Sequence, residues 1–471
     1  MFDALITYQA RAQPRAPAIL NPRGAVSYGE FEANINRMAA GLRRLGLSPA
    51  DGVVSVDLSG RAKLLAVMAL ARLGITSSGP TDPAADVRLV DTEHGDGSGR
   101  RIVLSPEWQA EMFAADPVPV PTAPWDLDGI LRIKLSSGTT RAPRRVAFTR
   151  RAYEASLRTS LISYGAGKGG LWKNVTGIDS GMGFNHSVAA WAVGGSVFSM
   201  PASPTLVQAI ETLRPSVLSC TPTFLRTIMR LLPWRFGLRV VVGGGLLPVV
   251  LAQEVRLRLS PDLRILYGAT ESSGIAMVDA TVQEQFPGAA GYPLPGVDIR
   301  ILDDAGAPLA PGGQGQVWIK ALQTAAAYIG DPEASARSFR HGGFMPGDIG
   351  HLAPDGLLVL DGRADDRMNL GGFKFMPNLM EDVAITCPGV VDCAAFPVPD
   401  SRGIDECWLA VVQGEGFERE RLAALLTSHR PQLPPVRFAW TEEIPRNDMG
   451  KVERLRLREE AMAVLGLQPE P

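Results

Sequence analysis

The segment that decides the fold and the chemistry of this 471-residue chain is residues 130–146, ILRIKLSSGTTRAPRRV. An apolar, strand-like run, 130–135, leads directly into a loop of small hydroxyl residues, one glycine and three arginines. Backbone N–H groups and hydroxyls in such a loop can surround a phosphate chain, and arginine can neutralise its charge. The loop lacks the Gly-Lys-Ser/Thr ending of a Walker loop. Taken alone, the segment is equally typical of a surface Ser/Thr turn.

A second motif, YGATE at residues 267–271, follows the apolar strand-like run 263–266. Ligands of open parallel sheets bind beyond the carboxyl ends of the strands. There the ring of Tyr267 can stack on a base, Thr270 can reach a phosphate and Glu271 can hold Mg²⁺. A strand-end turn with a solvated glutamate is an equally simple interpretation of this motif by itself.

Two further motifs carry charged side chains near the C-terminal end. Asp348 can accept hydrogen bonds from the hydroxyls of a ribose, and Arg363, in the run DGRADD, can donate to them. Such runs are also common in charged turns. Lys451 lies in the glycine-containing stretch PRNDMGKVER, residues 445–454. A lysine of this kind is usually solvated, and it gains significance only if a domain closure carries it onto the first loop.

The composition excludes several classes of protein. The chain has 47 Lys and Arg against 49 Asp and Glu, a net charge of −2, which argues against a protein that coats nucleic acid or an anionic membrane. Its four cysteines form no CxxC pair, so neither a zinc site nor a disulfide framework is indicated. The start resembles no signal peptide, and no apolar run is long enough to span a bilayer. We expect a cytoplasmic enzyme, with monomer and homodimer both open.

Local patterns predict helices and short strands in alternation. A capping box at Ser27 and Glu30 begins an amphipathic helix that Gly46 ends, and a second helix runs from about residue 61 to 73. Ser203-Pro204 and Thr221-Pro222 begin two more helices. The polar, proline-rich segment 82–128 is expected to form loops with short strands.

The alternation with short apolar strands predicts a parallel sheet with helices on its faces, hence an α/β fold. After Gly296 short strands and glycine-rich turns predict a β-rich subdomain. From residue 365 onward the pattern is that of a small α+β unit.

Together and in this order, the motifs resemble those of the superfamily of AMP-forming acyl-CoA synthetases, adenylation domains and luciferases. SSGTTRAPRRV is similar to its phosphate loop, YGATE to YGxTE, and PRNDMGKVER to PxTxxGKxxR. The stretches 315–339 and 345–377 resemble two further family motifs. The resemblance implies a large N-terminal domain, 1–364, of stacked α/β sheets with a β-rich subdomain. It also implies a small mobile α+β domain, 365–471, with the hinge at Asp365.

The resemblance also implies site residues for ATP, Mg²⁺ and coenzyme A. Tyr267 would pack on adenine, Thr270 would touch the α-phosphate, Glu271 would bind Mg²⁺, and Lys451 would bridge the acid's carboxylate and the α-phosphate. The remaining nucleotide- and thiol-binding positions implied in this way are Ser136, Ser137, Gly138, Thr139, Thr140, Arg144, Gly244, Gly245, Gly268, Asp348, Arg363, Gly371, Gly372 and Lys374.

The acid pocket is expected along residues 181–198. Its Phe184-Asn185-His186-Ser187-Val188 resembles the FDxSV segment of amino-acid-activating domains, with Asn185 in place of the Asp that pairs with the α-ammonium group. This argues against an α-amino acid. His186 either matches the pocket His of acyl and aryl ligases or is a hydrogen-bonded wall residue. The apolar lining, which suits a fatty or aromatic acid, would be completed by Phe184, Trp191, Phe224, Gly243 and Ile275.

These residues together predict an AMP-forming acid–thiol ligase that joins a carboxylic acid to coenzyme A. One alternative is a stand-alone adenylating enzyme that loads a carrier protein in trans. Another is a non-catalytic relative that binds an acid or a nucleotide. Arg141 in place of the family's glycine, within the phosphate loop, is the feature that favours this last alternative.

Overall fold

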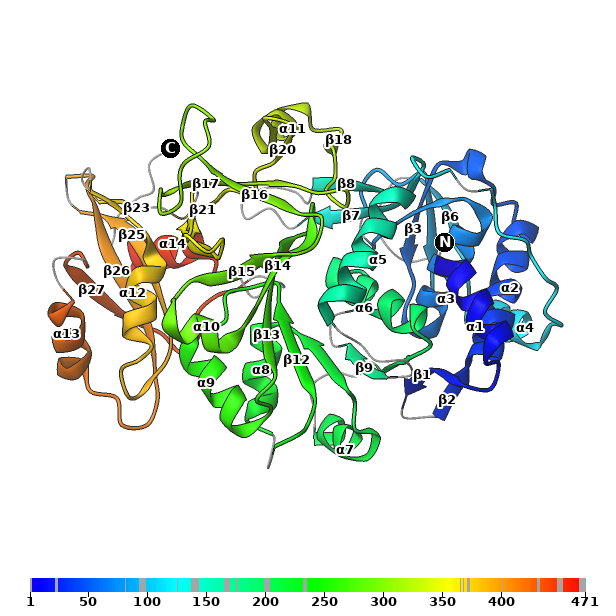
Figure 1. Cartoon of the computed structure of the whole chain (residues 1–471), viewed down its shortest axis with the longest axis horizontal. Helices are drawn as coiled ribbons and strands as arrows, with labels where there is room; N and C mark the ends of the chain where they lie inside the picture. The colour runs from blue at the N-terminus through cyan, green and yellow to red at the C-terminus, as the bar shows by residue number, and fades with distance from the viewer. Residues whose placement is uncertain are drawn as a thin grey trace.

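Two stacked sheets and a small C-terminal unit make up the fold (Figure 1). The computed structural model describes residues 2–21, 24–80, 82–92, 99–124, 126–136, 144–164, 170–174, 177–198, 204–231, 235–364, 366, 368–370, 373–400, 402–429, 433–446 and 452–465. No helix among these described residues is long and apolar enough to cross a membrane.

The N-terminal sheet has the strand order β18-β8-β7-β4-β3-β5-β6. Its strands are β3 (Val53–Asp57), β4 (Thr76–Ser78), β5 (Val87–Val90), β6 (Arg100–Val103), β7 (Ile130–Ser136), β8 (Arg144–Thr149) and β18 (Tyr328–Ile329). The helices of this part are α1 (Phe2–Ala12), α2 (Tyr28–Arg44), α3 (Gly60–Leu73), α4 (Pro106–Ala114), α5 (Arg150–Tyr164) and α6 (Gly181–Ala192), with a 3₁₀ turn at Pro49–Asp51.

The central sheet places six mutually parallel strands in the order β13-β12-β11-β9-β10-β1, and β2 pairs antiparallel with β1 at its edge. These are β1 (Pro17–Asn21), β2 (Gly24–Ser27), β9 (Leu171–Asn174), β10 (Ser196–Phe198), β11 (Val217–Cys220), β12 (Arg239–Gly243) and β13 (Leu263–Ala269). Helices α7 (Pro204–Leu213), α8 (Pro222–Met229), α9 (Val249–Arg258) and α10 (Ala280–Gln285) accompany it. The predicted parallel sheet with helices on its faces is confirmed.

Helices α5 and α6 lie between the two sheets, as Figure 1 shows. Helix α5 contacts β8 of the N-terminal sheet and β14 (Ser273–Asp279) of the central sheet, while α6 contacts β9, β10 and β14. The largest apolar core fills this layer and includes the buried rings of Phe2, Tyr153, Phe184 and Trp191. Burial of such rings is the main stabilising contribution to a layered fold of this kind.

Antiparallel strands continue the central sheet into the predicted β-rich subdomain, through the pairing of β15 (Ala289–Pro293) with β22 (Leu358–Arg363). Its strands are β14 (Ser273–Asp279), β15 (Ala289–Pro293), β16 (Asp298–Leu302), β17 (Gly315–Lys320), β19 (Phe339–Arg340), β20 (Gly343–Phe344), β21 (Asp348–Leu352) and β22 (Leu358–Arg363), with helix α11 (Pro332–Ser338).

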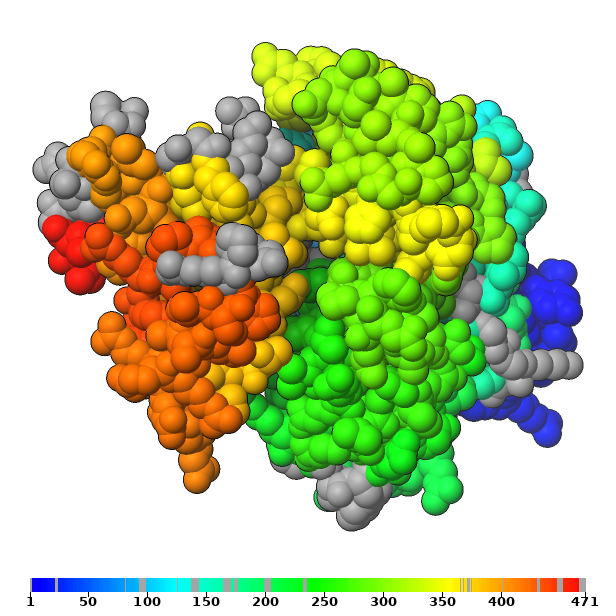
Figure 2. All heavy atoms as spheres, turned by 60° about the vertical axis from the view of Figure 1, so that its left-hand side comes forward, coloured from blue at the N-terminus to red at the C-terminus, as the bar shows by residue number. Residues whose placement is uncertain are grey.

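The C-terminal unit has apolar cores of its own, one of them from Met368 to Leu433. It contains β23 (Met368–Leu370), β24 (Phe373–Phe375), α12 (Pro377–Ala384), β25 (Val390–Pro399), β26 (Asp405–Gln413), α13 (Arg419–Ser428), β27 (Val436–Trp440) and α14 (Arg454–Leu465). Figure 2 shows its orange and red surface as a lobe beside the green and yellow surface of the larger part. The predicted α+β character is confirmed, whereas the boundary at residue 364 and the hinge at Asp365, which lies outside the described residues, stay predictions.

The expectation of loops and short strands over 82–128 is wrong in one respect. Helix α4 begins there at Pro106, and the side chain of Ser105 accepts a hydrogen bond from the Trp108 N–H. The predicted capping box at Ser27 and Glu30 is confirmed at the start of α2.

Candidate functional site

The base of the predicted phosphate loop is an antiparallel hairpin. Ser136 at the end of β7 pairs with Arg144 at the start of β8. The loop between them, with Ser137, Gly138, Thr139, Thr140 and Arg141, lies outside the described residues. The structure therefore fixes where the loop leaves and re-enters the sheet.

Glu271 lies next to this hairpin. Strand β18 runs beside β8, with Tyr328 opposite Val146, and the Tyr328 hydroxyl donates a 2.8 Å hydrogen bond to Oε1 of Glu271. The guanidinium of Arg144 stands 5.2 Å from the centre of the same tyrosine ring. Burial, together with the Glu271 carboxylate, raises the pKa of Tyr328 to about 12, so the phenol keeps the proton that it donates. A buried carboxylate and a guanidinium thus flank one ring beside the hairpin.

A second carboxylate cluster joins β13 to the β-rich strands. Asp348 at the start of β21 accepts hydrogen bonds from the Tyr267 hydroxyl and, over 3.1 Å, from Nη1 of Arg363 at the end of β22. Burial and the Asp348 carboxylate raise the pKa of Tyr267 well above its ordinary value. Of the predicted residues, the structure brings these three together. Thr270 lies in the turn between β13 and β14, next to Glu271.

Glycine is required where β13 and β14 meet. A Cβ at Gly268 would lie 2.1 Å from the carbonyl oxygen of Ser273, closer than any side chain tolerates. At the neighbouring end of β12, a Cβ on Gly243 would meet the Leu266 carbonyl at 3.0 Å. Gly244 has a φ of +84°, a left-handed conformation that glycine adopts at no steric cost. These glycines, with Gly245 after them, add no side chains at the carboxyl ends of β12 and β13. Ligands of open parallel sheets bind beyond such strand ends.

Helix α6 forms one wall beside these strand ends. Asn185 donates hydrogen bonds from Nδ2 to Ser156 at 2.9 Å and to Ser273 at 3.4 Å. Its carbonyl oxygen is buried without a hydrogen-bond partner among the described residues. A small apolar pocket lined by Phe2, Tyr153, Leu157, Asn185 and Val188 adjoins it.

His186, the next residue on α6, is engaged through both ring nitrogens. Nδ1 hydrogen bonds with the Ser219 hydroxyl, and Nε2 with the Tyr164 hydroxyl. Burial lowers the pKa of His186 to about 3, so the ring is neutral at physiological pH. A contact between His186 and the acid stays a prediction.

The other predicted pocket residues lie in different parts of the fold. Trp191 lies apart from Asn185, because its indole donates to the Ala18 carbonyl and packs against Phe31. The Phe184 ring packs on Phe2, and Ile275 is fully buried in the core of the β-rich strands. Phe224 is half-buried on α8, which begins beside Gly245, since a Cβ there would lie 3.7 Å from Pro222.

The profile of the AMP-binding enzyme family matches residues 6–88 and 80–329, more than half of the chain. The chain belongs to the AMP-binding enzyme family. A 3-hydroxybenzoate–CoA ligase of Aromatoleum sp. (strain CIB) is 24% identical over 491 residues, covering 94% of this chain and 93% of the relative. A fatty acid–[acyl-carrier-protein] ligase of Streptomyces coeruleorubidus is 26% identical over 504 residues, covering 96% and 95%.

The structural comparison agrees with this assignment. The crystal structure of ATP-bound MatB from Rhodopseudomonas palustris superposes with a TM-score of 0.87 at 22% identity, covering 98% of this chain and 100% of that one. At this identity the likeness concerns the fold. This AMP-binding enzyme therefore shares the two-domain architecture of its solved relatives, as expected from its motifs.

Sequence reasoning missed a buried cation of this AMP-binding enzyme. Lys134, two residues before Ser136 on β7, has its Nζ 4.1 Å from the centre of the Phe148 ring and 5.1 Å from that of Tyr153. The ammonium is buried without a hydrogen-bond partner among the described residues. Burial and the nearby Arg132 lower the pKa of Lys134 to about 7. The available signal was the pair of basic residues, Arg132 and Lys134, within the otherwise apolar run ILRIKL.

Several predicted positions cannot be placed. Lys451, Asp365, Gly371 and Gly372 lie outside the described residues, and only the backbone of Lys374 is described, in β24. Their roles in the AMP-binding enzyme stay predictions.

Proposed function

We propose that the protein is an AMP-forming acid–thiol ligase. It activates a carboxylic acid with ATP to an acyl-adenylate, releases pyrophosphate and transfers the acyl group to coenzyme A. The observation that carries the proposal is the hydrogen bond from Tyr328 to Glu271, because it holds a buried carboxylate beside the phosphate hairpin. Family membership and the order of the motifs point to the same chemistry.

ATP would lie across the strand ends of the central sheet. The loop between Ser136 and Arg144 and the Thr270 hydroxyl would hold its phosphates, Tyr267 would pack on the adenine, and Asp348 with Arg363 would bind the ribose. Asp348 suits this task because its two fixed donors hold the carboxylate rigidly in place.

Mg²⁺ would rest on Glu271 and the phosphate oxygens. No group of three or more His, Cys, Asp or Glu side chains in the described part of the chain could hold a metal ion by itself. One carboxylate is nevertheless the usual protein contribution, since Mg²⁺ in nucleotide sites is bound mainly through phosphates and water. The ion would supply positive charge where charge builds up at the α-phosphate.

The chemical difficulty is that two anions must meet. The acid's carboxylate attacks an α-phosphate of like charge, and Lys451 would neutralise both groups at that moment. Preorganised charge of this kind is usually the largest contribution to such reactions, and loss of one donor typically costs on the order of 100–1,000-fold in rate. The later attack of a thiol on the adenylate needs a different arrangement, for which rotation of the small domain about Asp365 is the proposed solution.

The acid is proposed to be aromatic or fatty, without an α-amino group. Asn185 stands where an acidic side chain would pair with an ammonium group, which argues against an α-amino acid. The names of the two curated relatives, which act on 3-hydroxybenzoate and on a fatty acid, support the same two classes.

Coenzyme A is the proposed acceptor, and a carrier protein is the second candidate. The first relative is named a CoA ligase and the second an acyl-carrier-protein ligase, and these names support coenzyme A and a carrier protein as the two candidate acceptors. Adding coenzyme A or a phosphopantetheine-bearing carrier to the same acid would distinguish them. The four cysteines are buried and form no disulfide with one another, which suits the proposed cytoplasmic location.

The test is an acid panel read by ATP–pyrophosphate exchange, with and without coenzyme A. We expect exchange with at least one aromatic or fatty acid, and none of it after Lys451→Ala. The same variant should still form thioester from supplied acyl-adenylate. Absence of exchange with every acid would favour the binding-only alternative, and equal loss of both half-reactions would contradict the rotating-domain mechanism.

A further inference from the structure

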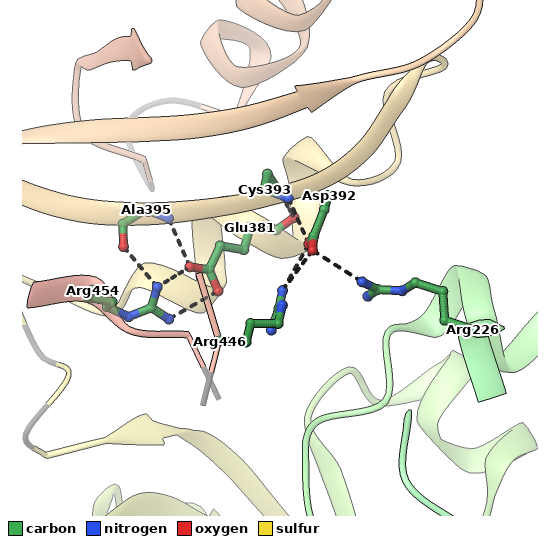
Figure 3. A network of polar contacts seen from close by, with 7 residues as sticks. All are labelled: Arg226, Glu381, Asp392, Cys393, Ala395, Arg446 and Arg454. Atoms are coloured by element: carbon green, nitrogen blue, oxygen red, sulfur yellow. Dashed lines mark hydrogen bonds and ion pairs between the residues drawn. The ribbon is translucent and has the colours of Figure 1, made fainter. Parts of the chain in front are cut away.

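Figure 3 shows an ion-pair network that includes Arg446 and Arg454, which in the sequence precede and follow Lys451. We propose that Arg446 and Arg454 are positioning residues for Lys451, anchored on Asp392 and Glu381. This inference rests on the proposed function, because it gives Lys451 its role in adenylation.

The anchor after Lys451 is a bidentate ion pair between Arg454, at the start of α14, and Glu381. Arg454 donates from Nη1 to Oε1 of Glu381 at 2.6 Å and from Nη2 to Oε2 at 3.3 Å, and Nη1 also reaches the Ala395 carbonyl at 3.0 Å. The Ala395 N–H donates to the same Glu381 oxygen at 2.8 Å. Burial opposes the charge of Arg454, yet the Glu381 carboxylate raises the pKa of the guanidinium above its ordinary value. Such paired contacts fix direction as well as distance.

The anchor before Lys451 uses Asp392 on β25. Nη2 of Arg446 lies 2.9 Å from Oδ1 and 3.1 Å from Oδ2 of this carboxylate, and the Cys393 N–H donates to Oδ1 at 2.9 Å. Arg446 also forms an isolated antiparallel bridge with Val452, the residue that follows Lys451. The backbone on either side of Lys451 is therefore tied to β25 through two arginines.

Asp392 has a second partner, which comes from the larger part of the chain. Nη1 of Arg226 on α8 lies 3.1 Å from Oδ2 of Asp392, as Figure 3 shows. Arg446 and Asp392 belong to the same unit and move together, whereas Arg226 belongs to the helix that carries Phe224. If the small unit rotates, the Arg226 contact breaks and the Arg446 anchor persists. The two arginines on one carboxylate can thus be tested separately.

These contacts bear on the placement of Lys451 as well as on stability. The side chains of Arg446 and Asp392 are 26% and 15% exposed and those of Arg454 and Glu381 are 18% and 16% exposed, so removing either arginine should also cost some stability. A misplacement of about 1 Å in a catalytic group can cost on the order of 100-fold in rate. Loss of either anchor should therefore lower the rate of adenylation, as loss of Lys451 does, but by a smaller factor.

The experiment compares Arg446→Gln and Arg454→Gln with Arg437→Gln in the full-length protein. Arg437 is the matched control, because it forms an exposed ion pair with Glu406 at 2.8 Å in the same unit, away from the network. We expect both anchor variants to lower acid-dependent ATP–pyrophosphate exchange by about 10- to 100-fold. Thioester formation from supplied acyl-adenylate should stay within about twofold of wild type for all three variants.

A purely structural role predicts a different result, since both half-reactions would then fall together with the melting temperature. That result, or unchanged exchange, would overturn the inference. Because Arg454 is the more buried arginine, Arg446→Gln keeps the test decisive if the other variant folds poorly. If no acid supports exchange in the wild type, the proposed function fails, and if Lys451→Ala shows no split between the half-reactions, the rotating-domain mechanism fails, so these failures are distinguishable from failure of the inference.

Arg226→Gln tests the link to α8. Spin labels on cysteines replacing the exposed Leu257 and Ile404 would report the distance between α9 and the small unit. We expect a broader distance distribution in Arg226→Gln than in the labelled parent, with Arg446→Gln as comparison. Identical distributions would show that the Arg226 contact does not hold the two parts together.

Discussion

Replacing Lys134 with methionine should stabilise the protein at neutral pH and flatten the pH dependence of its unfolding. The Lys134 ammonium is buried against the Phe148 and Tyr153 rings, and methionine fills a similar volume without charge. Burial, with a contribution from Arg132, lowers the pKa of Lys134 from 10.5 to about 7. That shift corresponds to about 5 kcal/mol of destabilisation of the charged form, at 1.36 kcal/mol per pKa unit.

The sign follows from proton binding. Between pH 7 and 10.5 the unfolded chain keeps the Lys134 proton while the folded protein has lost it, so stability rises with pH in this window and the full cost is present below it. Contacts with the two rings offset about 1–2 kcal/mol of that cost. At pH 7 the variant should be more stable by about 2–4 kcal/mol, and its advantage should shrink by about 3 kcal/mol at pH 10.

The assay is urea unfolding at both pH values, followed by tryptophan fluorescence. Trp172 and Trp191 belong to the apolar core that contains the Phe148 and Tyr153 rings, so their emission reports the region in question. Lys320→Met, at an exposed lysine of β17, controls for the loss of one amine. Parallel stability curves for wild type and Lys134→Met would refute the reasoning, because they would mean that the buried amine titrates alike in both states.

Three other substitutions test separate parts of the structure. Burial lowers the pKa of His186 to about 3, so the wild type loses stability as pH falls below about 6.5. His186→Gln should lose less stability over this range, as urea unfolding between pH 4 and 8 would measure. Asp348→Asn should raise the KM for ATP in pyrophosphate exchange by about 10-fold, because the charge opposite Arg363 is lost. Burial and Glu381 raise the pKa of Asp382 to about 6, so stability falls as pH rises from about 3.8 to 6. Because Asp382 is exposed on α12, water screens most of this cost, and Asp382→Asn should gain at most about 1 kcal/mol at pH 8 in the same unfolding assay.

Local sequence signals predicted those helices and strands whose boundaries depend only on residues adjacent in the sequence. The reciprocal bonds of Ser27 and Glu30 need no tertiary contact, so the start of α2 could be predicted from four consecutive residues. Helix α4 escaped prediction because Met112 is its one fully buried residue among those described, which leaves little amphipathic pattern. Its Ser105-Pro106 start is the same signal that identified α8, but it lies within a proline-rich stretch.

The candidate site could be predicted only in part for the same reason. Glu271 was predicted from the YGATE motif that follows a strand, and Asp348 from the match of residues 345–377 to a family motif. Their fixed partners were not, because the contact of Tyr328 with Glu271 depends on the register of β18 against β8, strands separated by about 180 residues of chain. Lys134 was overlooked for a different reason, since sequence pattern reports burial of a strand but not the cost of a charge within it.

The two-residue strand β18 has a consequence for anyone who recombines this enzyme with a relative. Although it lies at residues 328–329, it completes the sheet formed by residues 53–149. A crossover that takes the first half from one parent and the β-rich part from another would pair mismatched backbones at this edge. The exposed border of β8 would then invite association with foreign chains. Productive chimeras should therefore inherit Tyr328, Ile329 and the β7–β8 hairpin from the same parent.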